Sequence, residues 1–169
     1  MMIDGSAGAA PGGGLMANGG AATNGGAAAV EEAGDPTPSS GCGASTWPDS
    51  DRYTIDVSGS SREYILAMPD NYDPNQPYRL IFGWHWRGGQ ASDVAGNGVS
   101  GGPYYGLQSR ANGTAIFVSP EGIDNGWANT GGRDIEFLQA MLDRFNSELC
   151  IDQERIFSTG FSYGGMMEP

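Results

Sequence analysis

The segment Gly160–Gly164, with the sequence GFSYG, constrains the fold of this chain more than any other part. A G-x-S-x-G pattern is typical of a nucleophile elbow, a sharp turn between a strand and a helix that exposes a serine. Small residues on both sides of the serine let the strand and the helix approach closely. The preceding residues, Arg155–Thr159, are β-rich and mostly apolar, as expected of a buried parallel strand. The pattern therefore predicts a strand-to-helix turn with Ser162 at its tip.

The segments before the elbow predict a sheet with helices beside it. Alternation at 53–57, a turn at 58–61 and a second strand at 62–68 indicate an antiparallel hairpin. Apolar runs at 79–85 and 115–119 predict buried strands, with a short helix at 104–111 between them. Apolar residues at helical spacing predict a helix from Asp134 to about Glu148, with Asp134 in its cap or first turn. Alternating strands and helices of this kind indicate an α/β fold.

The first 40 residues differ in composition from the rest of the chain. They are almost entirely small or polar, and bury too little apolar surface to offset the entropy of ordering them. We therefore expect residues 1–40 to be a disordered Gly/Ala-rich linker, and residues 41–169 to form the folded domain. Residues 1–4 show no signal peptide, so a lost signal or a further domain joined through the linker is an alternative.

The charge and the scarcity of metal ligands exclude several classes of partner. A net charge of −12 argues against nucleic acid and anionic membranes, and no run is long enough to span a bilayer. There is one histidine, and Cys42 and Cys150 lack zinc spacing, so we expect no metal site. The two cysteines form either a disulfide, which implies an oxidising compartment, or two buried thiols. The sequence leaves both open.

Ser162 is the candidate nucleophile, and an ordinary glycine-rich turn is the alternative. In a nucleophile elbow the amide of the next residue, here Tyr163, donates to the oxyanion that forms during acyl transfer. A second donor comes from the loop after an earlier strand, and His85–Gly89 (HWRGG) occupies that place. We expect the amide of Trp86 or of Arg87 to be this donor.

His85 is the only histidine, but it precedes the serine. In folds built around a nucleophile elbow, the serine acts with an acid and a histidine that follow it in the chain, and the three form a catalytic triad. We therefore expect His85 to shape the oxyanion loop, with a role as catalytic base as the alternative. Asp124 and Asp134 also precede Ser162 and are expected in a turn and a helix cap. The triad Asp and His would then lie beyond Pro169.

The loop between the strand at 115–119 and the long helix is a candidate substrate contact. Trp127 could stack on an aromatic or sugar ring, and Asn129 could bind a substrate. Alternatively, Trp127 lies beneath the loop and Asn129 holds a turn. Tyr104 and Tyr105 present the same alternatives.

Several separated segments, in the same order, resemble secreted feruloyl esterases of the carbohydrate esterase family 1 and polyhydroxybutyrate depolymerase-like group. They are GCGAS (41–45), YILAMPDNYDP (64–74), PYRLIFGWHWRGG (77–89), the stretch 103–134 and LCIDQERIFSTGFSYGG (149–165). The resemblance covers about residues 40–169. It implies an α/β-hydrolase with a Ser-Asp-His triad, no cofactor and extracellular action on plant cell-wall esters. Of that triad, only Ser162 falls within this sequence.

The expected function is therefore a serine esterase of feruloyl type that acts on small-molecule or polysaccharide esters through an acyl-enzyme on Ser162. Acetyl-xylan esterase and polyhydroxybutyrate depolymerase are alternatives within the group. A catalytically dead remnant or carbohydrate-contacting module is an alternative from another class. Because the nucleophile has no base here, we expect the 169-residue fragment to be inactive.

Overall fold

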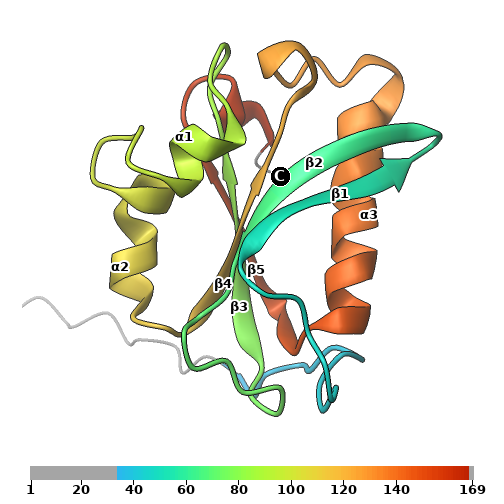
Figure 1. The fold of residues 1–169 in the computed structure, drawn as a ribbon, viewed down its shortest axis with the longest axis vertical. Coiled ribbons are helices and arrows are strands. Elements are labelled where there is room, and N and C mark those ends of the chain that lie inside the picture. Colours follow the sequence, from blue (N-terminus) through green and yellow to red (C-terminus); the bar gives the residue numbers. More distant parts are fainter. Residues whose placement is uncertain (1–33, 168–169) are drawn as a thin grey trace, which may run out of the picture. The chain divides into compact units, whose positions relative to one another are not determined.

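The computed structural model describes residues 34–167 (Figure 1). The strands are β1 (Asp51–Val57), β2 (Ser60–Ala67), β3 (Tyr78–Trp84), β4 (Ala115–Pro120) and β5 (Ile151–Gly160). The helices are α1 (Ala91–Ala95), α2 (Leu107–Ala111) and α3 (Arg133–Glu148), with short 3-10 segments at Pro103–Gly106, Ile123–Asn125, Thr130–Gly132 and Gly164–Met167. Most of the expected linker, residues 1–33, lies outside the described residues.

The five strands of the described residues form one mixed sheet in the order β1-β2-β4-β3-β5. The hairpin β1-β2 is antiparallel and joins β4 in antiparallel fashion, whereas β4, β3 and β5 are parallel. Phe82 of β3 is in register with Val118 of β4 and Ser158 of β5. The carboxyl ends of the three parallel strands therefore meet at one edge, where open α/β sheets bind their ligands.

Both faces of the sheet are covered (Figure 1). Helix α3 covers one face, where Phe137, Met141 and Phe145 are fully buried against the sheet. Helices α1 and α2 cover the other face, where Val94 and Tyr104 lie over Phe117 of β4. All six residues of β4 are buried, because the strand is covered on both faces.

The expected hairpin, buried strands and long helix are all present, with boundaries shifted by a few residues. The long helix begins at Arg133 and ends at Glu148, and β5 begins at Ile151, earlier than its apolar run. The short helix expected at 104–111 is only partly present, because only Leu107–Ala111 is α-helical. Tyr104 and Tyr105 have φ of 52° and 59°, so a 3-10 turn precedes the short helix α2. Helix α1 was not predicted; it is only five residues long.

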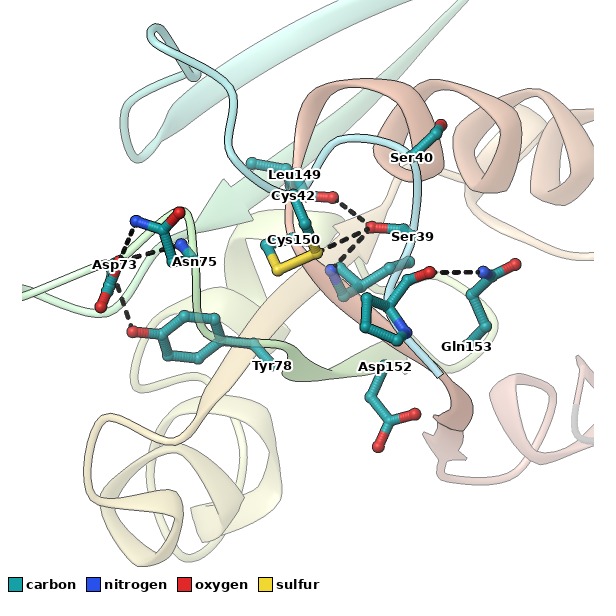
Figure 2. The surroundings of a disulfide bond; sticks show 12 residues. Ser39, Ser40, Cys42, Asp73, Asn75, Tyr78, Leu149, Cys150, Asp152 and Gln153 are labelled. Atoms are coloured by element: carbon teal, nitrogen blue, oxygen red, sulfur yellow. Dashed lines mark hydrogen bonds between the residues drawn. A yellow bond between two sulfur atoms is a disulfide. The ribbon is translucent and has the colours of Figure 1, made fainter. Parts of the chain in front are cut away.

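The contacts of the folded domain begin a few residues before the expected boundary at residue 41. The amide of Thr37 donates to Asp152 Oδ1 at 3.0 Å. The Ser39 hydroxyl donates to the carbonyl of Leu149 and accepts from the amide of Ile151 (Figure 2). Polar residues at 37–40 join the domain through hydrogen bonds rather than apolar contacts, so apolar patterning does not reveal them.

Candidate active site

Three loops meet at the carboxyl edge of the parallel strands. Residues 85–89 follow β3, residues 121–129 follow β4, and residues 161–165 follow β5. The amide of Gly88 donates to the carbonyl of Asn125 at 2.8 Å, and Asn125 Nδ2 donates to the carbonyl of Gly89 at 3.0 Å. The first two loops are therefore tied together by backbone acceptors. The sequence-predicted residues Ser162, Tyr163, Trp86, Arg87 and Trp127 all lie on these loops.

Ser162 lies at the tip of a tight turn between β5 and a short helical segment. Its φ is 56°, a region that non-glycine residues seldom adopt, and the residue is exposed. The amide of Gly164 donates to the carbonyl of Phe161 at 3.0 Å, and that of Gly165 donates to the carbonyl of Ser162 at 3.1 Å. Strained backbone of this kind is retained where it presents a reactive group. The local geometry is that of a nucleophile elbow.

The glycines of the elbow permit its close approach to β3. A Cβ on Gly164 would collide with the carbonyl oxygen of Trp84 and lie 2.8 Å from that of His85. A Cβ on Gly160 would lie 2.5 Å from the carbonyl carbon of Gly164. No side chain fits at either position without moving backbone, so both glycines of the G-x-S-x-G pattern are required by packing.

The candidate oxyanion donors are backbone amides of the elbow and of the loop after β3, which pack against each other. Among the described residues, no hydrogen bond is found from the amides of Tyr163, Trp86 or Arg87. The carbonyl of Trp86, in contrast, accepts from the amide of Gly89 at 3.0 Å and from His85 Nδ1 at 2.7 Å. The loop is therefore fixed through its carbonyl, which leaves its amides available.

His85 is fully buried and has both ring nitrogens occupied. The amide of Gly122 donates to Nε2 at 3.0 Å, which requires that Nδ1 carry the proton and donate to the carbonyl of Trp86. The ring lies 4.8 Å from that of Trp127. His85 thus joins the loops after β3 and β4, and has no free nitrogen to accept a proton from Ser162. Shaping the loop is the role that these contacts favour.

Trp127 and Asn129 are both engaged within the protein. Trp127 is 2% exposed, stacks edge-on against Trp84 and donates from Nε1 to the carbonyl of His85 at 2.9 Å. Asn129 Oδ1 accepts from the amide of Asp134 at 3.1 Å, and Asp134 Oδ2 accepts from the amide of Asn129 at 2.7 Å. These contacts favour the packing alternative for Trp127 and the turn alternative for Asn129.

Tyr105 connects the elbow to β3, a role that its sequence position did not indicate. Its hydroxyl donates to the carbonyl of Trp84 at 2.7 Å. Burial raises the pKa of the Tyr105 phenol, and a hydrogen bond with the backbone of Phe161 opposes that rise. One side chain from the loop before α2 therefore contacts the ends of both β3 and β5. The signal that could have indicated it is the glycine-rich run around the two tyrosines, GGPYYG.

Within residues 34–167, no three His, Cys, Asp or Glu side chains lie close enough together to hold a metal ion. None of the helices described is long and apolar enough to cross a bilayer.

Comparison with known proteins gives several relatives that are named feruloyl esterases. The chain is 54% identical over 108 residues to a probable feruloyl esterase C of Aspergillus niger, covering 64% of this chain and 40% of the relative. It is 45% identical over 138 residues to feruloyl esterase D of Neurospora crassa, and the match covers 77% of this chain and 47% of that relative. In sequence, the chain is similar to feruloyl esterases. It spans less than half the length of these feruloyl esterases, and no family model matches it.

Solved esterases share the fold of this chain. A mutant of the feruloyl esterase module from Clostridium thermocellum, complexed with sinapinate, superimposes with a TM-score of 0.56 at 18% identity. The match covers 78% of this chain and 52% of that one. Another ferulic acid esterase gives a TM-score of 0.55 at 16% identity, over 68% and 50% of the two chains. The fold is that of an α/β-hydrolase.

Proposed function

We propose that this chain carries the nucleophile portion of a serine carboxylic ester hydrolase of feruloyl type. The observation that carries the proposal is the exposed Ser162 at φ 56°, held in a tight turn against β3. The amides of Tyr163, Trp86 and Arg87 donate no hydrogen bond within residues 34–167. The names of the relatives support feruloyl esters over acetyl-xylan or polyester substrates. The carbohydrate-contacting alternative, which would use Trp127 and the tyrosines, has less support, because Trp127 and Tyr104 are buried.

In the proposed reaction, the Ser162 hydroxyl attacks the ester carbonyl and forms a tetrahedral oxyanion. The amides of Tyr163 and of Trp86 or Arg87 donate to that oxyanion, and the alcohol leaves to give an acyl-enzyme. Water then attacks the acyl-enzyme, which releases the acid and restores the serine. No metal or cofactor takes part in this scheme.

The proton of Ser162 requires a base that the described residues do not supply. His85 has both nitrogens bonded to backbone groups. The relatives are more than twice as long as the part of them that this chain matches. We propose that the triad Asp and His lie outside the matched residues, and we expect the 169-residue fragment to show little turnover.

The proposed substrates are hydroxycinnamate esters of plant cell walls, either as small molecules or on polysaccharides. We also propose that the protein is secreted. The bond between Cys42 and Cys150 supports this, because disulfides persist in oxidising compartments.

The direct test is release of ferulate from methyl ferulate by the protein expressed from its complete reading frame. Substituting Ser162→Ala should reduce kcat/KM by about three orders of magnitude or more, since the nucleophile is lost. Ser92→Ala, at an exposed serine of α1, is the matched control and should retain full activity. A wild-type protein that hydrolyses no carboxylic ester would favour the remnant alternative.

A further inference from the structure

A groove of about 270 Å³ lies at the edge of the sheet opposite to Ser162. It is lined by residues 47–50, which precede β1, and residues 68–72, which follow β2, and we call it the amino-edge groove. Because β2 is antiparallel to β4, its last residue, Ala67, pairs with Phe117 near the amino end of β4. Ser162 follows the carboxyl end of β5, and β4 and β5 are both parallel to β3. A ligand in this groove would therefore not touch the elbow.

The groove is built from two segments with the same pattern. Trp47-Pro48-Asp49 precedes β1, and Met68-Pro69-Asp70 follows β2. The amide of Met68 donates to Ser50 Oγ at 2.8 Å, which ties the two segments together. Each proline has a fixed φ, so each aspartate extends from a backbone of restricted freedom.

Trp47 provides an exposed aromatic surface in the groove. It is 40% exposed, although its ring lies against that of Tyr72, with centroids 5.3 Å apart. Tyr72 stacks on the buried Tyr78 at 5.1 Å, and its hydroxyl accepts from the amide of Cys150 at 2.7 Å. Cys150 is itself bonded to Cys42. An aromatic surface held in this way loses little entropy when a ligand binds.

The polar side chains of the groove are available to a ligand. Asp49, Asp70 and Asn71 are exposed, and their side chains form no hydrogen bond or ion pair within residues 34–167. Carboxylates only accept hydrogen bonds, whereas a carboxamide both donates and accepts. No lysine, arginine or histidine lines the groove. The groove therefore suits a ligand rich in hydroxyl donors and repels an anionic one.

We propose that the amino-edge groove is a second binding site that takes a neutral polysaccharide, namely a xylan chain. A sugar ring presents C–H groups on its faces, which pack on an aromatic ring, and hydroxyls at its rim, which donate to carboxylates. Acidic polysaccharides are disfavoured by the two aspartates and by the net charge of −12. The site goes beyond the proposed function, and only the choice of xylan rests on that function.

A second site would change how the enzyme meets a polymer and would leave the cleavage of the ester itself unaltered. While the groove holds one stretch of the polysaccharide, ester groups elsewhere on the same chain stay close to Ser162. Their effective concentration at the elbow therefore rises without any new contact there.

The test measures binding of the protein expressed from its complete reading frame to insoluble arabinoxylan that has been de-esterified with alkali. Every protein carries Ser162→Ala, so that ester cleavage plays no part. Adding Trp47→Ala should weaken binding about tenfold, whereas Trp47→Phe, which keeps a ring against Tyr72, should weaken it less than about threefold. Gln76→Ala is the matched control, at an exposed residue of the same connection that does not line the groove, and should bind like its parent.

Asp70→Asn distinguishes a sugar from a cationic partner. It keeps an accepting oxygen and removes the charge, so binding to arabinoxylan should persist and should not respond to salt. If the protein instead binds a polylysine peptide more tightly than arabinoxylan, and Asp70→Asn abolishes that binding, the groove takes a cationic partner and the proposal is overturned. Equal binding of arabinoxylan by Trp47→Ala and its parent, or no binding by the parent, also overturns it.

Failure of this site and failure of the proposed function are distinguishable. Methyl ferulate carries no sugar, so its hydrolysis by the wild type tests the esterase alone. A protein that hydrolyses methyl ferulate without Trp47-dependent binding lacks the site and remains an esterase. One that binds arabinoxylan through Trp47 and hydrolyses no ester has the site and contradicts the esterase. Asp70→Ala, at an exposed residue, should also weaken binding and keeps the test available if Trp47→Ala does not fold.

Discussion

At the scale of single residues, the elbow is determined by what its glycines exclude. Ser162 has a strained backbone with positive φ. Gly160 and Gly164 allow this turn to pack directly against its own strand and against the end of β3, where a Cβ at either position would collide with backbone. His85 is a residue type that often acts in catalysis, but here both of its ring nitrogens form hydrogen bonds with backbone groups. Residue type alone therefore does not assign a role here.

Substituting Gly164→Ala should destabilise the protein by about 1–3 kcal/mol, because the new methyl group collides with the Trp84 carbonyl and the loop must shift. It should also reduce esterase activity, since the elbow would move away from the oxyanion loop. Gly165→Ala is the matched control: its nearest contact would be the carbonyl oxygen of Gly160 at 3.7 Å, and its free energy of unfolding should change by less than about 0.5 kcal/mol. Urea unfolding measures the free energy of unfolding of both variants. If Gly164→Ala and Gly165→Ala lose equal stability, the packing argument is contradicted.

At the scale of elements, the start of α3 is held by a buried ion pair. Arg62 of β2 donates to Asp134 Oδ1 at 3.0 Å, and the two side chains are 4% and 0% exposed. The guanidinium also lies 4.1 Å above the Phe137 ring and donates to the carbonyl of Arg133. Burial lowers the pKa of Arg62, and Asp134 opposes that effect. These contacts fix α3, and with it the loop that precedes the helix, against the hairpin.

Asp134→Ala should destabilise the domain by about 3–5 kcal/mol, because it leaves Arg62 buried without a counter-charge. Glu63→Ala is the comparison. Glu63 pairs with Arg52 at 3.0 Å, but both side chains are more than 40% exposed, so the loss should be about 0–1 kcal/mol. Thermal unfolding of the full-length protein distinguishes them. A small loss for Asp134→Ala would contradict the argument that Arg62 needs Asp134 as its buried counter-charge.

The elements predicted well from the sequence are those with a clear apolar pattern. The helix at 133–148 has apolar residues at helical spacing, and the buried strands β3 and β4 are nearly continuous apolar runs. The first part of the helix expected at 104–111 was wrong because Tyr104 and Tyr105 adopt positive φ, which composition does not reveal. The elbow was predictable because its motif reflects a steric requirement. An apolar cavity beside the elbow was not predictable from the sequence. Its lining residues Trp86, Val99, Tyr105 and Phe161 come from separate segments that only the fold brings together.

At the scale of the whole domain, one covalent bond joins its beginning to its centre. Cys42 and Cys150 form a disulfide across 108 residues of sequence (Figure 2). Ser39 lies beside it, bonded to the backbone on either side of Cys150. Because Cys150 lies between α3 and β5, the bond connects the N-terminal segment to the strand that leads to Ser162.

Replacing both cysteines by alanine should lower the free energy of unfolding by about 2–5 kcal/mol, since a long loop is released in the unfolded chain. Unfolding in urea, with and without a reducing agent, measures this. The wild type should become less stable on reduction, and the double variant should not respond. A wild type that contains no free thiol yet is unaffected by reductant would contradict a stabilising bond.

The central claim, that Ser162 is a nucleophile, is tested most directly by covalent labelling with a fluorophosphonate and peptide mass mapping. The protein expressed from its complete reading frame should gain one phosphonyl group, on the peptide that contains Gly160–Gly165. Ser162→Ala should gain none, and Ser92→Ala should label like the wild type. A label on another serine, or no label on a folded protein that carries the complete frame, would contradict the account.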